Sequence, residues 1–419
     1  MSFGVRPEAI AVLTAEDHAV LHAIYQHRCL SEEQISHFFY ANLDNGENGY
    51  TIDRINMLIE VGFIVSHEYK SASWVYFLTY TGVQYVRNTS DRPLYTVKER
   101  GGKRQYEATA GTLILPDGML DHQCRLNDLA LTIIHQSGLD PDCYKDNLFA
   151  RNFTYAQPDA VIELPSFDLF LEMDMGHERL SALRNKWDHY RTYFRSRDYQ
   201  LRRNKKIIVL FATENVQKLH LRRNSIVKSI AQTSMDLLGS MFECYIGSNW
   251  TMELIAKRLL EGQNPEFQRA LDLIQTSLRI QLAKPKWLSK VCWGDCRFLQ
   301  LQNGISILVV DGLSGPMSIL KLIAYFGQIK QAFSSTAYQG IKLLVLVPGE
   351  TDICRDLMAA EIRLDTDALY TTEERLLKFE FHEAVFVFDQ LGNRYHFADM
   401  MMQTRCYEKQ QFRIRRKYK

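Results

Sequence analysis

The stretch with the clearest potential for chemistry is QPDAVIELPSFDLFLEMDMGHE, residues 157–178, because six of its side chains are carboxylates. Its two apolar runs predict two β-strands joined by a short Pro-Ser turn. Side chains at positions i and i+2 of a strand share a face, which puts Glu172 and Asp174 side by side. Asp159, across the hairpin, could join them. Three such carboxylates would raise one another's pKa unless a cation neutralised them, so the pattern indicates a metal-binding nuclease centre or its remnant.

A metal-dependent nuclease needs hard oxygen ligands for Mg²⁺ and a group that holds or deprotonates the attacking water. Asp159, Glu172 and Asp174 would be the catalytic ligands of such a metal. The nuclease pattern places a lysine two residues after the acid, where it steadies charge on the scissile phosphate, but here that residue is Asp174. Lys186 could supply the missing ammonium from the next helix, or it could lie on the outer face. Cleavage, a silent nuclease-like fold that contacts DNA, and a structural acidic patch all remain open.

The elements that would position these carboxylates follow one another in the order α-β-β-β-α-β. A helix is predicted first, by an apolar stripe at helical spacing. Three short strands, a second helix and a continuous apolar run of the buried-strand type come after it. The expected ranges are 118–138 for the first helix, 147–153, 160–164 and 168–173 for the three strands, 177–196 for the second helix and 205–213 for the last strand.

The first ninety residues have a different pattern, which predicts three helices and a two-stranded wing. Thr14 with Asp17 and Ser31 with Gln34 have capping-box spacing and mark the first two helix starts. Gly62 is the expected C-cap of the third helix. After this helix the apolar period changes to two, which predicts two short strands on either side of residues 70–73. The order is typical of a winged helix–turn–helix.

A winged helix can read DNA through the exposed face of its third helix. The residues expected on that face are Tyr50, Thr51 and Arg54, with Lys70 on the wing placed to touch phosphate or the minor groove. The alternative is a winged helix that contacts proteins. It is favoured by acidic residues near the same face, since carboxylates repel phosphate.

Charge and cysteine content set further bounds. The net charge is only +1, but basic residues cluster at 98–104, 195–206, 218–223 and 413–419, and clustered Lys and Arg are how proteins meet phosphate backbones. Within the second cluster we expect Arg202, Arg203 and Lys205 to bind DNA; the alternative is a set of solvated helix ends. Eight scattered cysteines form no zinc-type spacing and fit a reduced, cytoplasmic protein.

The strand order, with Pro158-Asp159 opening one strand and Glu172 near the end of the next, resembles the PD-(D/E)XK nuclease fold. With the upstream winged helix, the chain is similar to the replication-relaxation family of plasmids and integrative elements over roughly residues 10–215. The residues that carry this resemblance are HQCRLN at 122–127, Pro158-Asp159, LEMD at 171–174 with Gly176, and Lys186 with Tyr190. It implies a mobile-element protein that binds double-stranded DNA and assists plasmid replication or relaxation.

The C-terminal half repeats the pattern of the centre. Asp174 to Lys205 and Asp311 to Lys342 each span 31 positions, and a strand–helix–strand pattern fills both intervals. We infer a second, degenerate nuclease-like unit in which Val309 replaces Glu172. The alternative is that any β-hairpin–helix–strand unit looks alike. The expected fold is α/β, with a winged helix at 10–90, a linker at 91–117, a nuclease-like domain at 118–250 and its degenerate copy with a basic tail at 251–419.

Three functions follow from these patterns. The first is a DNA-binding accessory protein of a mobile element whose nuclease-like fold is inactive. The second is a Mg²⁺-dependent endonuclease or nickase, and the third is a winged-helix transcriptional regulator, which would be a strong dimer. Replication or conjugation proteins and a second copy of the chain are the expected protein partners. No P-loop pattern supports an ATPase, and no run of 18 apolar residues predicts a membrane span.

Overall fold

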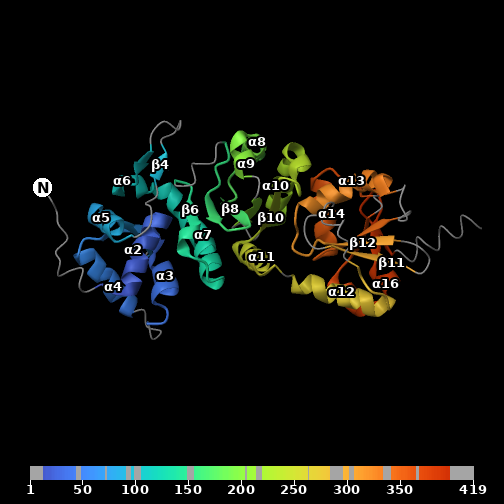
Figure 1. Cartoon of the computed structure of the whole chain (residues 1–419), viewed down its shortest axis with the longest axis horizontal. Coiled ribbons are helices and arrows are strands. Elements are labelled where there is room, and N and C mark those ends of the chain that lie inside the picture. Colours follow the sequence, from blue (N-terminus) through green and yellow to red (C-terminus); the bar gives the residue numbers. More distant parts are fainter. Residues whose placement is uncertain are drawn as a thin grey trace, which may run out of the picture. The chain divides into compact units, whose positions relative to one another are not determined.

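The computed structural model of the chain (Figure 1) is a mixed α/β structure with two compact units. Unit 1 consists of residues 1–178, 192–216 and 247–260, and unit 2 of 179–191, 217–246 and 261–419. The domain boundaries expected from the sequence stay a prediction. The residues that the structure describes are 13–43, 49–70, 73–90, 96–98, 105–148, 155–202, 205–213, 219–262, 264–283, 296–301, 306–333, 341–364 and 368–396.

Unit 1 begins with helices whose starts the sequence predicts correctly. Thr14 caps α2 (Ala15–His27) and Ser31 caps α3 (Glu32–Ile35), each with a complete capping box. The helix expected to end near Tyr40 does so, but its last turn is a π-helix, η1 (Ser36–Tyr40). The third helix is α4 (Gly49–Glu60). Figure 1 shows these helices together in the blue, N-terminal part of the chain.

A hairpin follows the helices, as predicted. Strands β2 (Ile64–Lys70) and β3 (Ser73–Leu78) are antiparallel, and the short β1 (Leu30–Ser31) completes a sheet in the order β1-β3-β2. Gly62, the expected C-cap, has φ +83°, a left-handed conformation that favours glycine. Helix α5 (Tyr80–Thr89) comes next. The segment predicted to be a linker contains a second hairpin and a short helix: β4 (Thr96–Lys98), β5 (Gln105–Glu107) and α6 (Ala110–Leu113).

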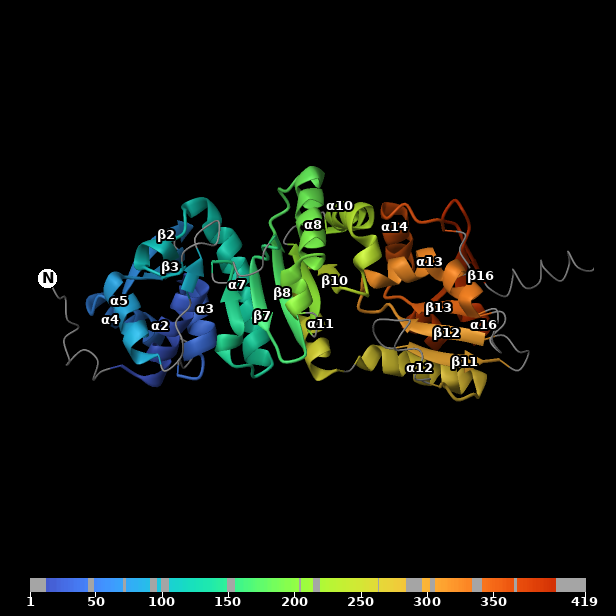
Figure 2. The ribbon, with the colours of Figure 1, turned by 45° about the horizontal axis from the view of Figure 1, so that its top comes forward.

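The central elements of the chain follow one another in the predicted order α-β-β-β-α-β, although most of the second helix, α8, is assigned to unit 2. The strands of the central sheet run in the order β9-β8-β7-β6; β6, β7 and β8 are antiparallel neighbours, and β8 and β9 are parallel. Figure 2 shows α7 beside β7 and β8. The bounds are α7 (Asp117–Gln136), η2 (Pro141–Cys143), β6 (Tyr144–Asp146), β7 (Ala160–Glu163), β8 (Phe167–Asp174), α8 (Leu180–Phe194), α9 (Arg197–Arg202), β9 (Lys206–Thr213) and α11 (Asn249–Glu261).

The position predicted for one strand of this sheet is wrong, because the strand lies earlier in the chain than expected. The strand expected at 147–153 is β6, which ends at Asp146. The Asp146 carboxylate accepts a hydrogen bond from the backbone N–H of Leu148, which turns the chain where the strand was expected to begin. Residues 149–154 of the expected strand lie outside the described residues.

Unit 2 contains a sheet in the order β11-β12-β13-β14-β15-β16, with β11 antiparallel to β12 and β12 parallel to β13. Figure 2 shows α12 on one side of it and α13 and α14 on the other. The bounds are α10 (Leu219–Thr233), η4 (Met235–Leu237), β10 (Phe242–Gly247), α12 (Pro265–Leu278), β11 (Cys296–Gln300), β12 (Ser306–Asp311), α13 (Ser318–Phe333), β13 (Lys342–Leu346), α14 (Glu350–Ala359), β14 (Ala368–Thr371), α15 (Glu373–Lys378), α16 (Phe381–Ala384), β15 (Phe386–Phe388) and β16 (Arg394–His396).

The two sheets share a local pattern that bears on the predicted repeat. Strands β7-β8-β9 and β11-β12-β13 have the same antiparallel-then-parallel pairing. Asp174 and Asp311 end equivalent strands, and each accepts a backbone hydrogen bond from the residue two positions on. A second copy of the unit by duplication stays a prediction. Within the described residues, no helix is both long and apolar enough to cross a membrane.

Candidate nucleic-acid interface and acidic site

Asp159 lies just before β7, and its carboxylate forms contacts with the neighbouring strand and with α7. Its Oδ2 accepts a hydrogen bond of 2.8 Å from the backbone N–H of Met173 and lies 3.3 Å from Nε2 of His122 on α7. The side chains of His122 and Asp159 are 25% and 21% exposed, so the pair is open to solvent. An imidazole beside a carboxylate can exchange protons with a bound molecule, which makes this pair the chemically competent part of the acidic stretch.

The three acidic residues of β8, Asp168, Glu172 and Asp174, are buried. Two of them form hydrogen bonds that satisfy their buried carboxylates. Asp168 accepts a hydrogen bond of 3.1 Å from Nζ of Lys205, which neutralises it inside the sheet. Asp174 accepts from the N–H of Gly176, closing the turn after the strand. Glu172, two residues before the end of β8, is fully buried. Lys205, which was expected to bind DNA, is thus paired with an internal carboxylate. The side chain of Lys205 is still 38% exposed.

The geometry gives these carboxylates no common metal-binding arrangement. Across the part of the chain that the structure describes, no three or more His, Cys, Asp or Glu side chains come together as ligands of one ion. A metal role for Asp159, Glu172 and Asp174 therefore stays a prediction. Lys186 lies on α8 and is half-buried, and its role as the displaced ammonium is also a prediction.

The third helix, α4, corrects the predicted DNA-reading face. Thr51 is fully buried and Tyr50 is half-buried against the N-terminal core, with its ring edge-on to Tyr40 at 5.7 Å. Arg54 turns inward, where its Nε donates a hydrogen bond of 3.1 Å to Oδ1 of the buried Asp17. Of the three side chains expected on the exposed face, Thr51 is buried, and Tyr50 and Arg54 are half-buried. DNA binding by these residues stays a prediction. The exposed residues of α4 are Gly49, Ile52, Asp53, Asn56 and Glu60.

The β2–β3 hairpin, which the sequence predicts to be a wing, also contacts the rest of unit 1. Lys70 donates a hydrogen bond of 2.7 Å to Oδ1 of Asp121, to which Tyr69 also donates. His67 lies 3.0 Å from Oδ1 of Asp117. Both acids belong to α7. The exposed surface of α4 and the wing therefore offers little positive charge to a phosphate backbone.

A basic hollow lies where α8 ends and α9 begins. It has a volume of about 480 Å³ and is lined by Tyr155, Thr192, Arg195, Ser196, Arg197 and Asp198. Arg195 and Arg197 are exposed, and Tyr155 is 54% exposed. Tyr155 is four residues before Asp159, so at most about 14 Å of chain separates their Cα atoms. The side chain of Arg202 and all of Arg203, both expected to bind DNA, lie outside the described residues.

Residues 21–210 match the family model described as replication-relaxation. Over this segment, somewhat less than half of its length, the chain is similar to the replication-relaxation family. No curated protein matches the chain. No solved structure matches it either. The match covers the N-terminal helices, the wing and the central sheet up to β9.

The HQCRLN motif of the replication-relaxation region joins its N-terminal helices to its central sheet. Gln123 on α7 donates to the backbone carbonyl of His27 at 3.2 Å and to Oδ2 of Asp146 at 3.0 Å. Asn127, one turn further on, donates to the carbonyls of His27 and Cys29. Gln34 donates to the carbonyl of Cys124 at 2.8 Å. We call His27, Gln34, Gln123, Asn127 and Asp146 the polar lock.

Burial sets the charge of the polar lock. It lowers the pKa of His27 to about 3, so that imidazole is neutral, and the ring stacks on Tyr144 at 4.0 Å. Burial also raises the pKa of Asp146, opposed by Arg28, whose guanidinium lies 3.9 Å away. Because the buried polar groups bond one another, the N-terminal helices are fixed to α7 in one orientation.

His122 and Tyr155 are the residues that reasoning from the sequence missed as parts of a site. His122 is the first residue of the HQCRLN motif, and its place in that motif was the signal available in the sequence. Tyr155 gave no signal in the sequence; its backbone has a left-handed conformation, φ +77°, that is rare outside glycine.

Proposed function

We propose that the chain is a DNA-binding accessory protein in the replication of a mobile genetic element. The replication-relaxation match supports the replication-related part of this function. In this proposal, residues 10–90 are a winged helix, and the central sheet is a nuclease-like fold that serves as a scaffold. Double-stranded DNA is the partner. A role for replication or conjugation proteins, or for a homodimer, stays a prediction.

The observation that carries the proposal is the basic hollow. Two exposed guanidiniums, Arg195 and Arg197, can each bind a phosphate through paired N–H groups. The hydroxyls of Thr192 and Ser196 are further donors of the kind that contact DNA backbones. The exposed ring of Tyr155 offers a flat surface to a sugar or an unpaired base. The hollow thus combines the groups that position a duplex without reading its sequence.

A scaffold role for the acidic stretch is supported by how its carboxylates are used. Asp159 bonds Met173, Asp168 bonds Lys205, and Asp174 bonds Gly176. These bonds stabilise the ends of β7 and β8 and would be disturbed by moving the carboxylates onto a metal. The lysine of the nuclease pattern is also replaced by Asp174.

One observation favours the second candidate, a Mg²⁺-dependent nuclease. His122 stands 3.3 Å from Asp159, and both are partly open to solvent. An imidazole held by a carboxylate can act as a general base toward water. In that function Asp159, Glu172 and Asp174 would be the metal ligands and His122 or Lys186 the proton-handling group.

The proposal predicts that the double charge reversal Arg195→Glu/Arg197→Glu weakens binding to duplex DNA at least about tenfold near 0.1 M salt, because two phosphate contacts become repulsive. The plot of log K against log salt should also become shallower, its negative slope shrinking in magnitude by about 2, because two phosphate contacts are lost. Fluorescence anisotropy of a labelled duplex, titrated at several salt concentrations, measures both quantities.

The matched control is Lys257→Glu/Arg258→Glu on α11, which changes the net charge equally outside the hollow. It should leave the affinity and the slope close to those of the native protein. Equal losses in the two double variants would mean that net charge alone governs binding, and the hollow would not be the interface.

A further inference from the structure

A second cavity of unit 1 has a composition unlike that of the basic hollow. It has a volume of about 360 Å³, within the size range of small-molecule sites, about 300–1,000 Å³. It is bounded by α2, η1, the end of α5, α7 and the η2 turn. The lining residues are Ala19, His22, Ala23, Gln26, His27, Phe39, Thr89, Ser90, Leu131, Ile134, His135, Asp140, Pro141 and Asp142.

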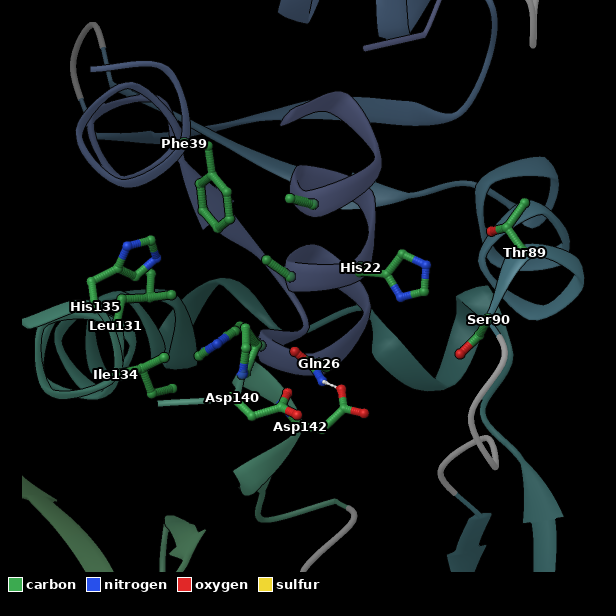
Figure 3. Close-up of a pocket in the computed structure, with 14 residues that line it drawn as sticks. His22, Gln26, Phe39, Thr89, Ser90, Leu131, Ile134, His135, Asp140 and Asp142 are labelled. Atoms are coloured by element: carbon green, nitrogen blue, oxygen red, sulfur yellow. Dashed lines mark hydrogen bonds between the residues drawn. The ribbon is translucent and has the colours of Figure 1, made fainter. Parts of the chain in front are cut away.

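One end of this cavity is acidic. Asp140 and Asp142 bring two carboxylates, and no Lys or Arg stands among its lining residues in the described part of the chain. His27 contributes no positive charge, since burial lowers its pKa to about 3. Figure 3 shows the two carboxylates close together, with the Gln26 amide donating to Asp142 at 3.0 Å. Such a site disfavours phosphates and other anions and favours a cation.

The opposite part of the cavity is apolar and aromatic. Leu131 and Ile134 of α7 lie beside Phe39, and the ring of Phe39 stands edge-on to His135 at 5.8 Å (Figure 3). The aromatic ring and the aliphatic side chains can bury the flat apolar body of a bound molecule. The cavity therefore pairs a flat apolar wall with an acidic end.

We propose that this cavity binds a small organic cation, an amidinium, guanidinium or amine joined to a flat apolar body. The cationic head lies at Asp140 and Asp142, and the body lies against Phe39, Leu131 and Ile134. This inference does not depend on the proposed DNA-binding function. Because His27 belongs to both the cavity and the polar lock, an occupied cavity stabilises the attachment of the N-terminal helices to α7.

The test uses the full chain and two probes of nearly the same shape, benzamidine and its uncharged counterpart benzamide, at pH 8. Isothermal titration should show benzamidine binding at least about tenfold more tightly than benzamide, because only benzamidine makes charge-assisted hydrogen bonds. Benzamidine should also raise the melting temperature in a concentration-dependent way. Equal affinities for the two probes, or no binding of benzamidine, would overturn the proposal without any variant.

Variants then locate the site. Asp140→Asn/Asp142→Asn removes both charges and keeps the acceptors, including the one that caps η2 and the one that meets Gln26. It should abolish the preference for benzamidine over benzamide. The matched control Asp53→Asn/Glu60→Gln removes two exposed charges from α4 and should bind benzamidine as the native protein does. A preference that survives in the Asp140→Asn/Asp142→Asn protein places the cation elsewhere and rejects this cavity.

Discussion

Replacing Arg54 by alanine is expected to lower the free energy of unfolding by about 3–5 kcal/mol, because it leaves the buried carboxylate of Asp17 without its countercharge. Burial alone would raise the pKa of Asp17, but the bonds from Arg54, the Thr14 N–H and Tyr40 hold it below its ordinary value. A carboxyl with a lowered pKa stabilises the fold above its unfolded pKa of about 4 and loses that contribution as the pH falls. Urea unfolding at pH 7 measures the loss.

The same variant separates the two roles considered for Arg54. If Arg54 were a DNA-reading residue, its removal would weaken DNA binding and leave stability within about 0.5 kcal/mol of the native value, as for an ordinary surface change. We expect the reverse: a large loss of stability, and unchanged DNA affinity in the fraction that remains folded. Asn56→Ala, an exposed change on the same helix, is the control and should alter neither quantity.

The second large effect is expected at Glu243 in unit 2. Burial raises the pKa of this carboxyl to about 7, although it accepts hydrogen bonds from the N–H groups of Cys244 and Ser318 and from the Ser318 hydroxyl. An acid with a raised pKa gives its full stability below the unfolded pKa of about 4.5 and loses it as the pH rises toward 7. The shift corresponds to about 3 kcal/mol. Glu243→Gln should therefore be more stable than the native protein at pH 8 by up to that amount.

The measurement is the unfolding free energy at a series of pH values from about 4.5 to 8. The native protein should lose stability across this window relative to Glu243→Gln, and the two curves should meet near its acidic end. Glu380→Gln, an exposed change in the same unit, should follow the native curve. Parallel curves for the native protein and Glu243→Gln would mean that Glu243 keeps one charge state throughout.

Local signals in the sequence were enough to predict most elements of unit 1. The capping boxes at Thr14 and Ser31 and the glycine at position 62 depend on contacts within a few residues, so their spacing is readable directly. Strand β9, which is parallel to β8, was predictable because a buried parallel strand is a continuous apolar run. Strand β6 was misplaced, because its end depends on a hydrogen bond from the backbone N–H of Leu148 to the Asp146 side chain. Elements β4, β5 and α6 were also missed, since their segment was expected to be a linker.

The site could not be predicted in the same way, since its geometry depends on contacts between distant residues. Arg54 flanks the apolar stripe of α4, and a side chain that long can turn toward solvent or the core. Its direction is decided by Asp17, 37 positions earlier. Lys70 and Lys205 likewise look like phosphate ligands in the sequence, but each meets a carboxylate of its own unit. A cluster of charged residues in a sequence predicts the sign of the surface charge only when the residues that pair with carboxylates of the same protein are left out of the count.

The central claim, that the nuclease-like fold of this protein binds DNA without cutting it, is tested most directly by incubating the purified chain with supercoiled plasmid in Mg²⁺, Mn²⁺ or EDTA. The native protein and Asp159→Asn/Glu172→Gln are compared for nicking on a gel and for binding by mobility shift. We predict a shifted but intact plasmid in all three conditions and equal affinity in both proteins. Metal-dependent nicking by the native protein that the double variant lacks would contradict the claim and identify the acidic stretch as a working catalytic centre.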